Sequence, residues 1–331
     1  MRTFALSIIT VLAACSTSNT AGDDDVGVDA PASGVDAPGG DVDAAGGGDA
    51  TTATMCEGRS TQPLDAVWTL EHGGLSRSIR VHVPASYDPN VPTPVVLDFH
   101  GYTMSAQSQE DMTRFKTKAD SAGFIAVHPD GTGSPRGWNA GACCGAPATN
   151  NTDDIGFVMA LLDQLEVRLC VDTRRVFSTG FSNGGFLSHR LACEQADRIA
   201  AIAPVAGMMG MSTCSPSRPV PVMHFHGTSD SIVPYNGGGL TGYRSAAETD
   251  AGWATRNGCD TATTESFASG DSRCMTHSGC DGGAEVTLCT ISGGGHTWPG
   301  GGYFPGGHIT TDLSATDAMW AFFVAHPMPG D

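Results

Sequence analysis

Basic side chains are scarce in this sequence: its 331 residues include 17 Lys and Arg against 35 Asp and Glu, a formal net charge of −18 at pH 7. The few that occur are scattered, and no basic stripe runs along any segment. Proteins that bind nucleic acid neutralise its phosphates with clustered Lys and Arg. We therefore expect no nucleic acid partner.

The apolar run near the start of the chain is too short to cross a bilayer. It covers residues 4–14, whereas a spanning helix needs about 20 apolar residues. Arg2 before the run and small residues at its end are typical of an export signal. Leu12-Ala13-Ala14-Cys15 also resembles the bacterial lipobox, whose cysteine receives a lipid. We expect residues 1–15 to be a lipoprotein-type signal that attaches the protein to outer-membrane lipid through Cys15, with simple cleavage and secretion as the alternative.

Large side chains are almost missing from residues 16–55, which consist mainly of Gly, Ala, Asp, Ser and Thr. Such a segment cannot bury enough apolar surface to offset the entropy of ordering. It carries eight Asp and no Lys or Arg, so its charges repel one another and extend it. A calcium site at Asp23-Asp24-Asp25 is an alternative, but no spaced EF-hand pattern follows. We expect a disordered acidic tether.

Cysteine, in contrast, is plentiful, with 11 residues. An even number remains once Cys15 is set aside, and an even set in an exported chain favours disulfides. The ten are Cys56, Cys143, Cys144, Cys170, Cys193, Cys214, Cys259, Cys274, Cys280 and Cys289. Zinc bound by Cys274, His277, Cys280 and Cys289 is the alternative, but the paired CxxC spacing of structural zinc sites is absent. We expect disulfides of undetermined pairing, no metal and no cofactor.

After Cys56, short apolar runs rich in β-branched residues alternate with longer amphipathic ones, which indicates strands separated by helices and a mainly parallel sheet. We expect strands at 77–83, 94–99, 124–128, 175–179, 199–205, 220–225 and 285–291, and helices at 108–122, 153–169, 183–196 and 314–325. The pattern predicts one α/β domain over residues 56–331, a three-layer sandwich with helices on both faces of the sheet and no internal repeats.

One motif carries nucleophile chemistry. Gly180-Phe181-Ser182-Asn183-Gly184 fits G-x-S-x-G at the point where an expected strand turns into an expected helix. In such a nucleophile elbow the serine adopts a strained backbone conformation, and the glycines avoid collisions with the neighbouring strand and helix. The helix amino end favours developing negative charge. We assign Ser182 as the nucleophile; a simple Gly/Ser turn is the alternative.

A serine hydroxyl needs a base, and the base needs an orienting acid, in the chain order Ser, acid, His. Asp230 ends His226-Gly227-Thr228-Ser229-Asp230, directly after an expected strand. His296 lies in the glycine-rich segment after the last expected strand. We expect His296 to be the general base and Asp230 to hold its tautomer. Weaker alternatives are Asp153 and Asp154, which are typical of a helix start, His224 and His226, which are typical of buried structural histidines, and His308, a surface residue.

Acyl transfer also needs donors for the oxyanion of the tetrahedral intermediate. The backbone N–H of Asn183, directly after the nucleophile, is one expected donor. The N–H of Tyr102 is the second, because His100-Gly101-Tyr102 follows the buried strand expected at 94–99.

Together these motifs resemble carbohydrate esterase family 1, in the group that joins polyhydroxybutyrate depolymerase-like proteins with feruloyl and acetylxylan esterases. The resemblance runs through His100-Gly101, Trp138 to Gly145, Asp153 to Phe157, Gly180 to Gly185, His226 to Pro234 and Gly293 to Gly300. It implies an α/β-hydrolase fold, a triad of Ser182, Asp230 and His296, and an extracellular esterase that works without a cofactor. Tyr102 stands where some depolymerases carry a cysteine, which argues against polyester specificity.

The resemblance implies a serine esterase that forms an acyl-enzyme. Its expected substrates are ester-bearing plant polysaccharides, polyesters or small aromatic esters, and the protein is expected to be a monomer. Tyr102, Trp138 and Trp298 are candidates for an aromatic wall around the substrate, with core packing as the alternative for the tryptophans. A serine peptidase of the same fold and a non-catalytic polysaccharide-binding lipoprotein are the alternative functions.

Overall fold

A computed structural model of the chain describes residues 56–59, 61, 62, 64–239 and 242–330. The predictions for the export signal at 1–15, lipidation of Cys15 and the tether at 16–55 lie outside these residues. Within the described part, no helix has the length and apolar character that crossing a membrane requires.

The centre of the domain is one ten-stranded sheet in the order β1-β2-β4-β3-β5-β6-β7-β10-β9-β8. Six neighbouring strands, from β4 to β10, are parallel, and antiparallel pairs flank them on both sides. The strands are β1 (Asp65–His72), β2 (Leu75–His82), β3 (Thr93–Phe99), β4 (Ile125–Pro129), β5 (Val171–Phe181), β6 (Ala201–Val205), β7 (Val222–Gly227), β8 (Thr263–Ser269), β9 (Ser272–His277) and β10 (Val286–Ile291).

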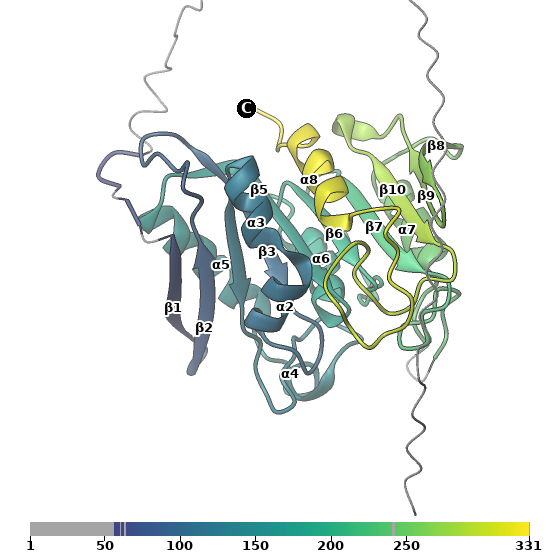
Figure 1. Ribbon diagram of the computed structural model, residues 1–331, viewed down its shortest axis with the longest axis horizontal. Helices are drawn as coiled ribbons and strands as arrows, with labels where there is room; N and C mark the ends of the chain where they lie inside the picture. The colour runs from purple at the N-terminus through teal and green to yellow at the C-terminus, as the bar shows by residue number, and fades with distance from the viewer. Residues whose placement is uncertain (1–55, 60, 63, 240–241, 331) are drawn as a thin grey trace, which may run out of the picture. The chain divides into compact units, whose positions relative to one another are not determined.

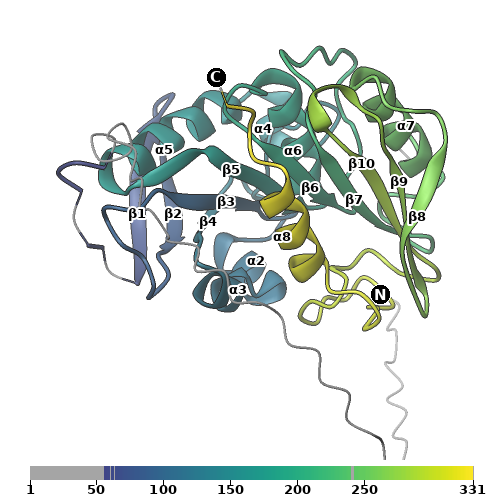
Figure 2. The same ribbon diagram turned by 90° about the horizontal axis from the view of Figure 1, so that it is seen from above.

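Helices cover both faces of this sheet, which confirms the predicted three-layer α/β fold (Figures 1 and 2). One face carries α2 (Ala106–Thr113), α3 (Phe115–Ala122) and α8 (Ala315–Ala325). The other carries α5 (Asp154–Arg168), α6 (Asn183–Glu194) and α7 (Ala246–Arg256). The short α4 (Gly145–Thr149) precedes α5, and a 3-10 turn spans Asp281–Gly283. Each face has its own apolar core.

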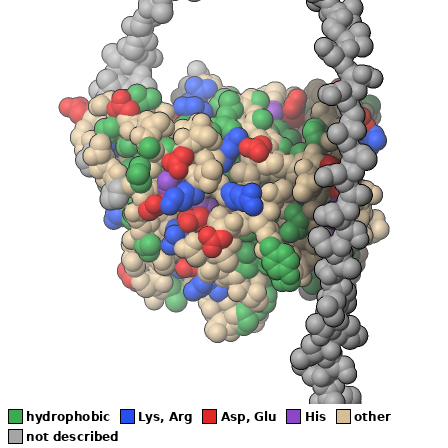
Figure 3. Space-filling view, viewed as in Figure 1, with side chains coloured by type: hydrophobic (Ala, Val, Ile, Leu, Met, Phe, Trp, Pro, Cys, Tyr) green, Lys and Arg blue, Asp and Glu red, His purple; other side chains and the backbone are tan. Residues whose placement is uncertain are grey.

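Every residue of β3, β4 and β6 is buried, because helices shield both faces of the central strands. This burial explains why these strands appear in the sequence as continuous apolar runs. On the face shown in Figure 3, acidic and basic side chains are interspersed. Among the ion pairs of the described residues, Lys116–Asp65 is exposed, whereas in Arg80–Glu110 the carboxylate is buried.

The single helix predicted over 108–122 is wrong: it is two helices, broken at Arg114, whose φ is 58°. Five further elements had not been predicted: β1, β8, β9, α4 and α7. β8 is almost wholly exposed and rich in Thr and Ser, so it lacks the apolar signal of a strand. α7 does carry a sequence signal, because Ser245 and Glu248 form a capping box at its start.

The ten cysteines of the described domain form five disulfides, which confirms the prediction. The pairs are Cys56–Cys170, Cys143–Cys144, Cys193–Cys214, Cys259–Cys280 and Cys274–Cys289. Cys274 and Cys289 face each other in the register of β9 and β10. The alternative of zinc bound by Cys274, Cys280 and Cys289 is wrong, since each of these sulfurs is bonded to another sulfur.

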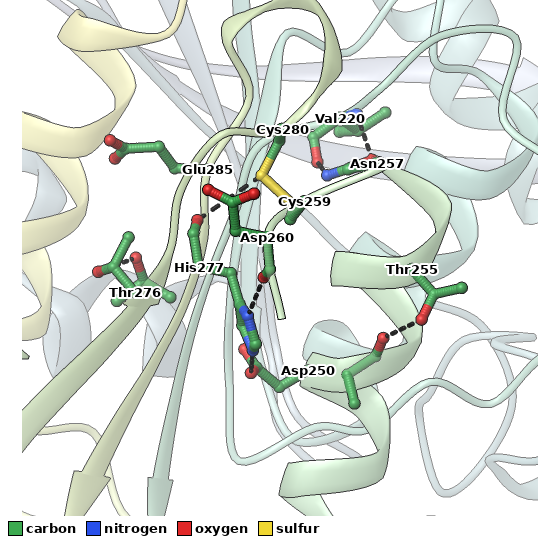
Figure 4. The surroundings of a disulfide bond; sticks show 12 residues. Val220, Asp250, Thr255, Asn257, Cys259, Asp260, Thr276, His277, Cys280 and Glu285 are labelled. Atoms are coloured by element: carbon green, nitrogen blue, oxygen red, sulfur yellow. Dashed lines mark hydrogen bonds and ion pairs between the residues drawn. A yellow bond between two sulfur atoms is a disulfide. The ribbon is translucent and has the colours of Figure 1, made fainter. Parts of the chain in front are cut away.

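A buried carboxylate, that of Asp250, contacts His277, whose own carbonyl lies 3.6 Å from the Cys280 sulfur of the Cys259–Cys280 disulfide (Figure 4). Asp250 of α7 lies 3.3 Å from Nε2 of His277, and the His277 Nδ1 is 2.9 Å from the Asp260 carbonyl oxygen. The second Asp250 oxygen, Oδ1, has no hydrogen-bond partner among the described residues. Burial raises the pKa of Asp250 to about 6, against the opposing effect of His277.

We predict that Asp250→Asn stabilises the protein at pH 8 by about 1–3 kcal/mol. The pKa of Asp250 is higher in the folded protein than in the unfolded chain, so folding favours the protonated carboxyl group. The free energy of unfolding of the wild type therefore gains a contribution from this group as the pH falls through 6 towards 4. The amide carries no charge, so the advantage of the variant should vanish near pH 4. Thermal unfolding at both pH values measures the difference. Asp260→Asn, an exposed neighbour, is the control, and a less stable Asp250→Asn at pH 8 would contradict the prediction.

Candidate active site

Ser182 occupies a sharp turn between β5, which ends at Phe181, and α6, which begins at Asn183. Its backbone has φ 54° and ψ −118°, a conformation that costs free energy for any residue with a Cβ. Two backbone hydrogen bonds hold it there: its N–H donates to Val205 O over 2.8 Å, and its carbonyl accepts from Phe186 N over 3.0 Å.

The glycines of the motif allow three backbones to meet beside this turn. A Cβ on Gly180 would lie 2.7 Å from the carbonyl oxygen of Phe99 in β3. A Cβ on Gly184 would overlap the same oxygen. β3, β5 and α6 can therefore approach one another only when these two positions lack side chains, as the nucleophile-elbow interpretation requires.

Asp230 and His296 come from the loops after β7 and β10, two neighbouring parallel strands. The Nδ1 of His296 lies 2.6 Å from Oδ2 of Asp230, and both side chains are buried. The other carboxylate oxygen accepts the backbone N–H groups of Ile232 and Val233, each over 2.8 Å. The carboxylate is therefore fixed from two sides.

The electrostatics keep Asp230 ionised. Burial alone would raise its pKa, but hydrogen bonds from His226 and His296 outweigh burial and hold the pKa of Asp230 well below its usual range. Because a carboxylate only accepts hydrogen bonds, His296 carries its proton on Nδ1 and leaves Nε2 free to accept another.

The residue before Ser182 packs against this pair: the Phe181 ring lies 4.7 Å from the His296 ring, centroid to centroid. The Ser182 hydroxyl makes no hydrogen bond within the described part of the chain. Catalytic hydrogen bonds are often longer in free enzymes and tighten when substrate binds. The structure thus joins Asp230 to His296 directly, and Phe181, the residue before Ser182, packs against the His296 ring.

The two expected oxyanion donors lie beside the serine. Asn183 begins α6, so its N–H has no helical carbonyl to bind. Its side-chain amide bonds to both the N–H and the carbonyl of Trp138, over 2.7 and 3.1 Å. Tyr102 is half-buried, and a Cβ on Gly145 would lie 2.6 Å from its hydroxyl. The Tyr102 N–H has no hydrogen-bond partner among the described residues.

The predicted aromatic wall of Trp138 and Trp298 is wrong, because both side chains are completely buried. The indole N–H of Trp138 donates to His100 O, and that of Trp298 donates to the Thr316 hydroxyl, each over 3.0 Å. Both rings pack edge-on against phenylalanines of the core. Core packing, the alternative interpretation, is therefore correct for the two tryptophans.

Apart from His226, whose Nε2 lies 3.3 Å from Oδ2 of Asp230, the weaker candidates make no hydrogen bond or ion pair with the expected triad in the described part of the chain. Asp153 caps α5 through Gly156 N, as expected of a helix-start residue. Asp154 is buried in an ion pair with Arg77, and the exposed His308 is 2.7 Å from Asp271. His224 and His226 are buried. Within the residues that the structure describes, no three His, Cys, Asp or Glu side chains are placed to hold a metal ion.

A hollow that had not been predicted is bordered by Phe304, whose ring packs against the His296 ring. Phe304 is 6.4 Å from the His296 ring and 5.1 Å from the Phe181 ring, centroid to centroid. It borders a cavity of about 330 Å³ whose lining includes Met104, Ser108, Asp111, Met112, Tyr303 and Phe304. Tyr303 is 87% exposed, an unusual state for a large aromatic side chain. The signal in the sequence is the aromatic pair in the glycine-rich stretch that follows His296.

Comparisons with known proteins find similarity to esterases. A family model described as Phospholipase/Carboxylesterase matches residues 85–244. Feruloyl esterase B of Piromyces equi is 33% identical over 234 residues; the match covers 66% of this chain and 42% of that protein, less than half of its length. Feruloyl esterase C of Emericella nidulans is 30% identical over 258 residues, covering 75% of this chain and 84% of that protein. An acetyl xylan esterase structure from Aspergillus awamori aligns with a TM-score of 0.59 at 15% identity over 78% of this chain and 99% of its own, which shows the shared fold.

We predict opposite effects for two helical glycines. Gly184→Ala forces a Cβ into the Phe99 carbonyl and should destabilise the protein by about 3 kcal/mol. In Gly252→Ala of α7, the new Cβ meets only the mobile end of the Arg256 side chain, so the variant should gain about 0.5–1 kcal/mol from helix propensity. Denaturant unfolding of both variants checks this. A free energy of unfolding for Gly184→Ala equal to that of the wild type would show that the elbow tolerates a side chain.

Proposed function

Because the chain belongs to the feruloyl esterase group of the α/β-hydrolases, we propose that it is an exported serine esterase that hydrolyses feruloyl or acetyl esters of plant cell-wall polysaccharide. The observation that carries the proposal is the 2.6 Å bond between Asp230 and His296 beside the strained Ser182. Ester-bearing polyesters are a second substrate class that the same chemistry would accept.

In this mechanism Ser182 attacks the ester carbonyl while its proton passes to Nε2 of His296, the nitrogen left free by the bond to Asp230. The tetrahedral intermediate collapses, the ester C–O bond breaks, and His296 returns the proton to the leaving alcohol. Water, deprotonated by the same nitrogen, then attacks the acyl-enzyme; the bond between the acyl carbon and Ser182 Oγ breaks, His296 returns the proton to that oxygen, and the acid is released. Asp230 stays ionised throughout and stabilises the imidazolium.

The backbone N–H groups of Tyr102 and Asn183 would bind the oxyanion. Loss of one such donor costs about 3 kcal/mol of transition-state stabilisation. The Asn183 amide bonds to Trp138 fix the start of α6, which supports this role. Tyr102 itself supplies aromatic surface at the edge of the site.

The leaving alcohol would occupy the hollow beside Phe304, because His296 must protonate it and Phe304 contacts His296. Tyr303 can stack on a sugar face, and Asp111 and Ser108 can bind its hydroxyls.

The five disulfides support export, since such bonds persist in oxidising compartments. In this proposal residues 1–15 direct export, Cys15 attaches the monomeric enzyme to outer-membrane lipid, and residues 16–55 form the tether. The alternative functions, a peptidase or a polysaccharide-binding scaffold, have less support, because the matched relatives are described as esterases.

We predict that Ser182→Ala lowers kcat for p-nitrophenyl acetate by more than about 1,000-fold, because the nucleophile is lost. The melting temperature should stay unchanged. Fluorophosphonate labelling should occur in the wild type and disappear in the variant. Ser121→Ala, an exposed serine of α3, is the control. Retained turnover in Ser182→Ala would end the proposal, and an unlabelled wild type would favour the scaffold alternative.

We predict that Tyr303→Ala raises KM for a feruloylated or acetylated xylan oligosaccharide about tenfold, from the loss of about 1.4 kcal/mol of stacking. Turnover of p-nitrophenyl acetate, which has no sugar, should remain close to wild type. Val67→Ala, an exposed apolar residue of the edge strand β1, is the control. If Tyr303→Ala lowered kcat/KM equally for the oligosaccharide and for p-nitrophenyl acetate, Tyr303 would not be part of the site that binds the leaving alcohol.

A further inference from the structure

Three buried histidines lie in a row behind Asp230, and the proposed mechanism uses none of them. His224 and His226 come from β7 and His189 from α6, and each is at most 1% exposed. The rings of His226 and His224 are 5.2 Å apart, and those of His224 and His189 are 5.8 Å apart, centroid to centroid.

The partners at the active-site end fix the protons of His226. Its Nε2 is 2.8 Å from the Val233 carbonyl and 3.3 Å from Oδ2 of Asp230. Both of these oxygens can only accept, so Nε2 carries a proton. The neutral ring then accepts at Nδ1, where Nε2 of His224 lies 3.1 Å away and donates. Nδ1 of His224 is therefore an acceptor, and it has no partner among the described residues.

The other end is fixed by a tryptophan. The Trp253 indole N–H, which can only donate, binds Nδ1 of His189 over 3.0 Å. The proton of His189 therefore sits on Nε2, and the ring also interacts with the Gly207 backbone. The His224 and His189 rings pack edge to face, and no hydrogen bond joins them within the described part of the chain. The donors that point towards Asp230 are therefore Nε2 of His224, which donates to His226, and Nε2 of His226, which faces the carboxylate.

Burial keeps the inner rings neutral. It lowers the pKa of His189 to about 3 and the pKa of His224 well below its ordinary value. Arg256 acts on His189 in the same direction. Besides Asp230 and His224, the titratable group that faces His226 is Tyr235, whose ring is 5.9 Å away and whose hydroxyl bonds to Thr290.

We propose that His226 is a positioning residue for ester hydrolysis, and that His226 and His224, packed against His189 and Trp253, hold the Asp230 carboxylate in place for His296. The proposal rests on the proposed function, because it takes Asp230 as the acid of the triad. The geometry suits this role, because the Nε2–H of His226 and the Nδ1–H of His296 face the same carboxylate oxygen, Oδ2 of Asp230.

The test compares two amides at the same position. In His226→Gln the side-chain N–H reaches the place of Nε2, and in His226→Asn it reaches only the place of Nδ1. We expect His226→Asn to lower kcat for p-nitrophenyl acetate about tenfold with KM unchanged. The acid limb of its pH profile should move to higher pH, because the charge of Asp230 then falls on His296 alone. His226→Gln should stay within about threefold of the wild type.

The matched control is His82→Asn. His82 is another buried histidine, at the end of β2, and its ring bonds to two carboxylates, those of Asp65 and Asp120. This variant should lower the melting temperature and leave the pH profile unchanged. Equal kcat and equal pH profiles in His226→Asn and His226→Gln would overturn the proposal. If Ser182→Ala in the same series kept its activity, the proposed function itself would fail, so the two failures are distinguishable.

Discussion

The contact between the Phe99 carbonyl and Gly184 constrains the whole candidate site. β3, β5 and α6 meet there without side chains between them, and this close approach forces Ser182 into its strained turn. The same arrangement sets the loop after β3, with Tyr102, beside the amino end of α6. Because parallel strands end at one edge, the loops after β7 and β10 bring Asp230 and His296 to that edge as well.

Residues whose role follows from local chain order were predictable from the sequence. Ser182, Asp230 and His296 each follow an apolar run, and strand direction alone places them at one sheet edge. Trp138 and Trp298 were not predictable in this way, since burial depends on which distant elements pack over a loop. The exposed β8 lacks an apolar pattern, so its pairing with β9 alone defines it as a strand. The hollow at Tyr303 is formed by segments about 190 residues apart, Met104 to Met112 and Gly302 to Phe304.

Buried polar groups organise the face of the sheet that carries α5, α6 and α7. Arg77 and Asp154 form an ion pair inside this layer, and Asp154 also accepts the Asn139 N–H over 2.6 Å. Asn139 is the neighbour of Trp138, whose backbone holds the Asn183 amide. The ion pair therefore supports the loop against which the amino end of α6 is fixed. The opposite core, under α2, α3 and α8, is mainly aromatic and aliphatic. Both layers combine an apolar core with buried polar pairs, and the Arg77–Asp154 pair is the one that orients the loop beside α6.

The Cys56–Cys170 disulfide has a mechanical consequence. Cys56 is the first described residue of the domain, and Cys170 directly precedes β5 in the middle of the sheet. Without this bond, tension along the preceding segment would peel β1 from the edge one hydrogen bond at a time. With it, the load passes to a central strand held by neighbours on both sides, where hydrogen bonds must break together. A chain pulled from its amino side would therefore resist force at its strongest element.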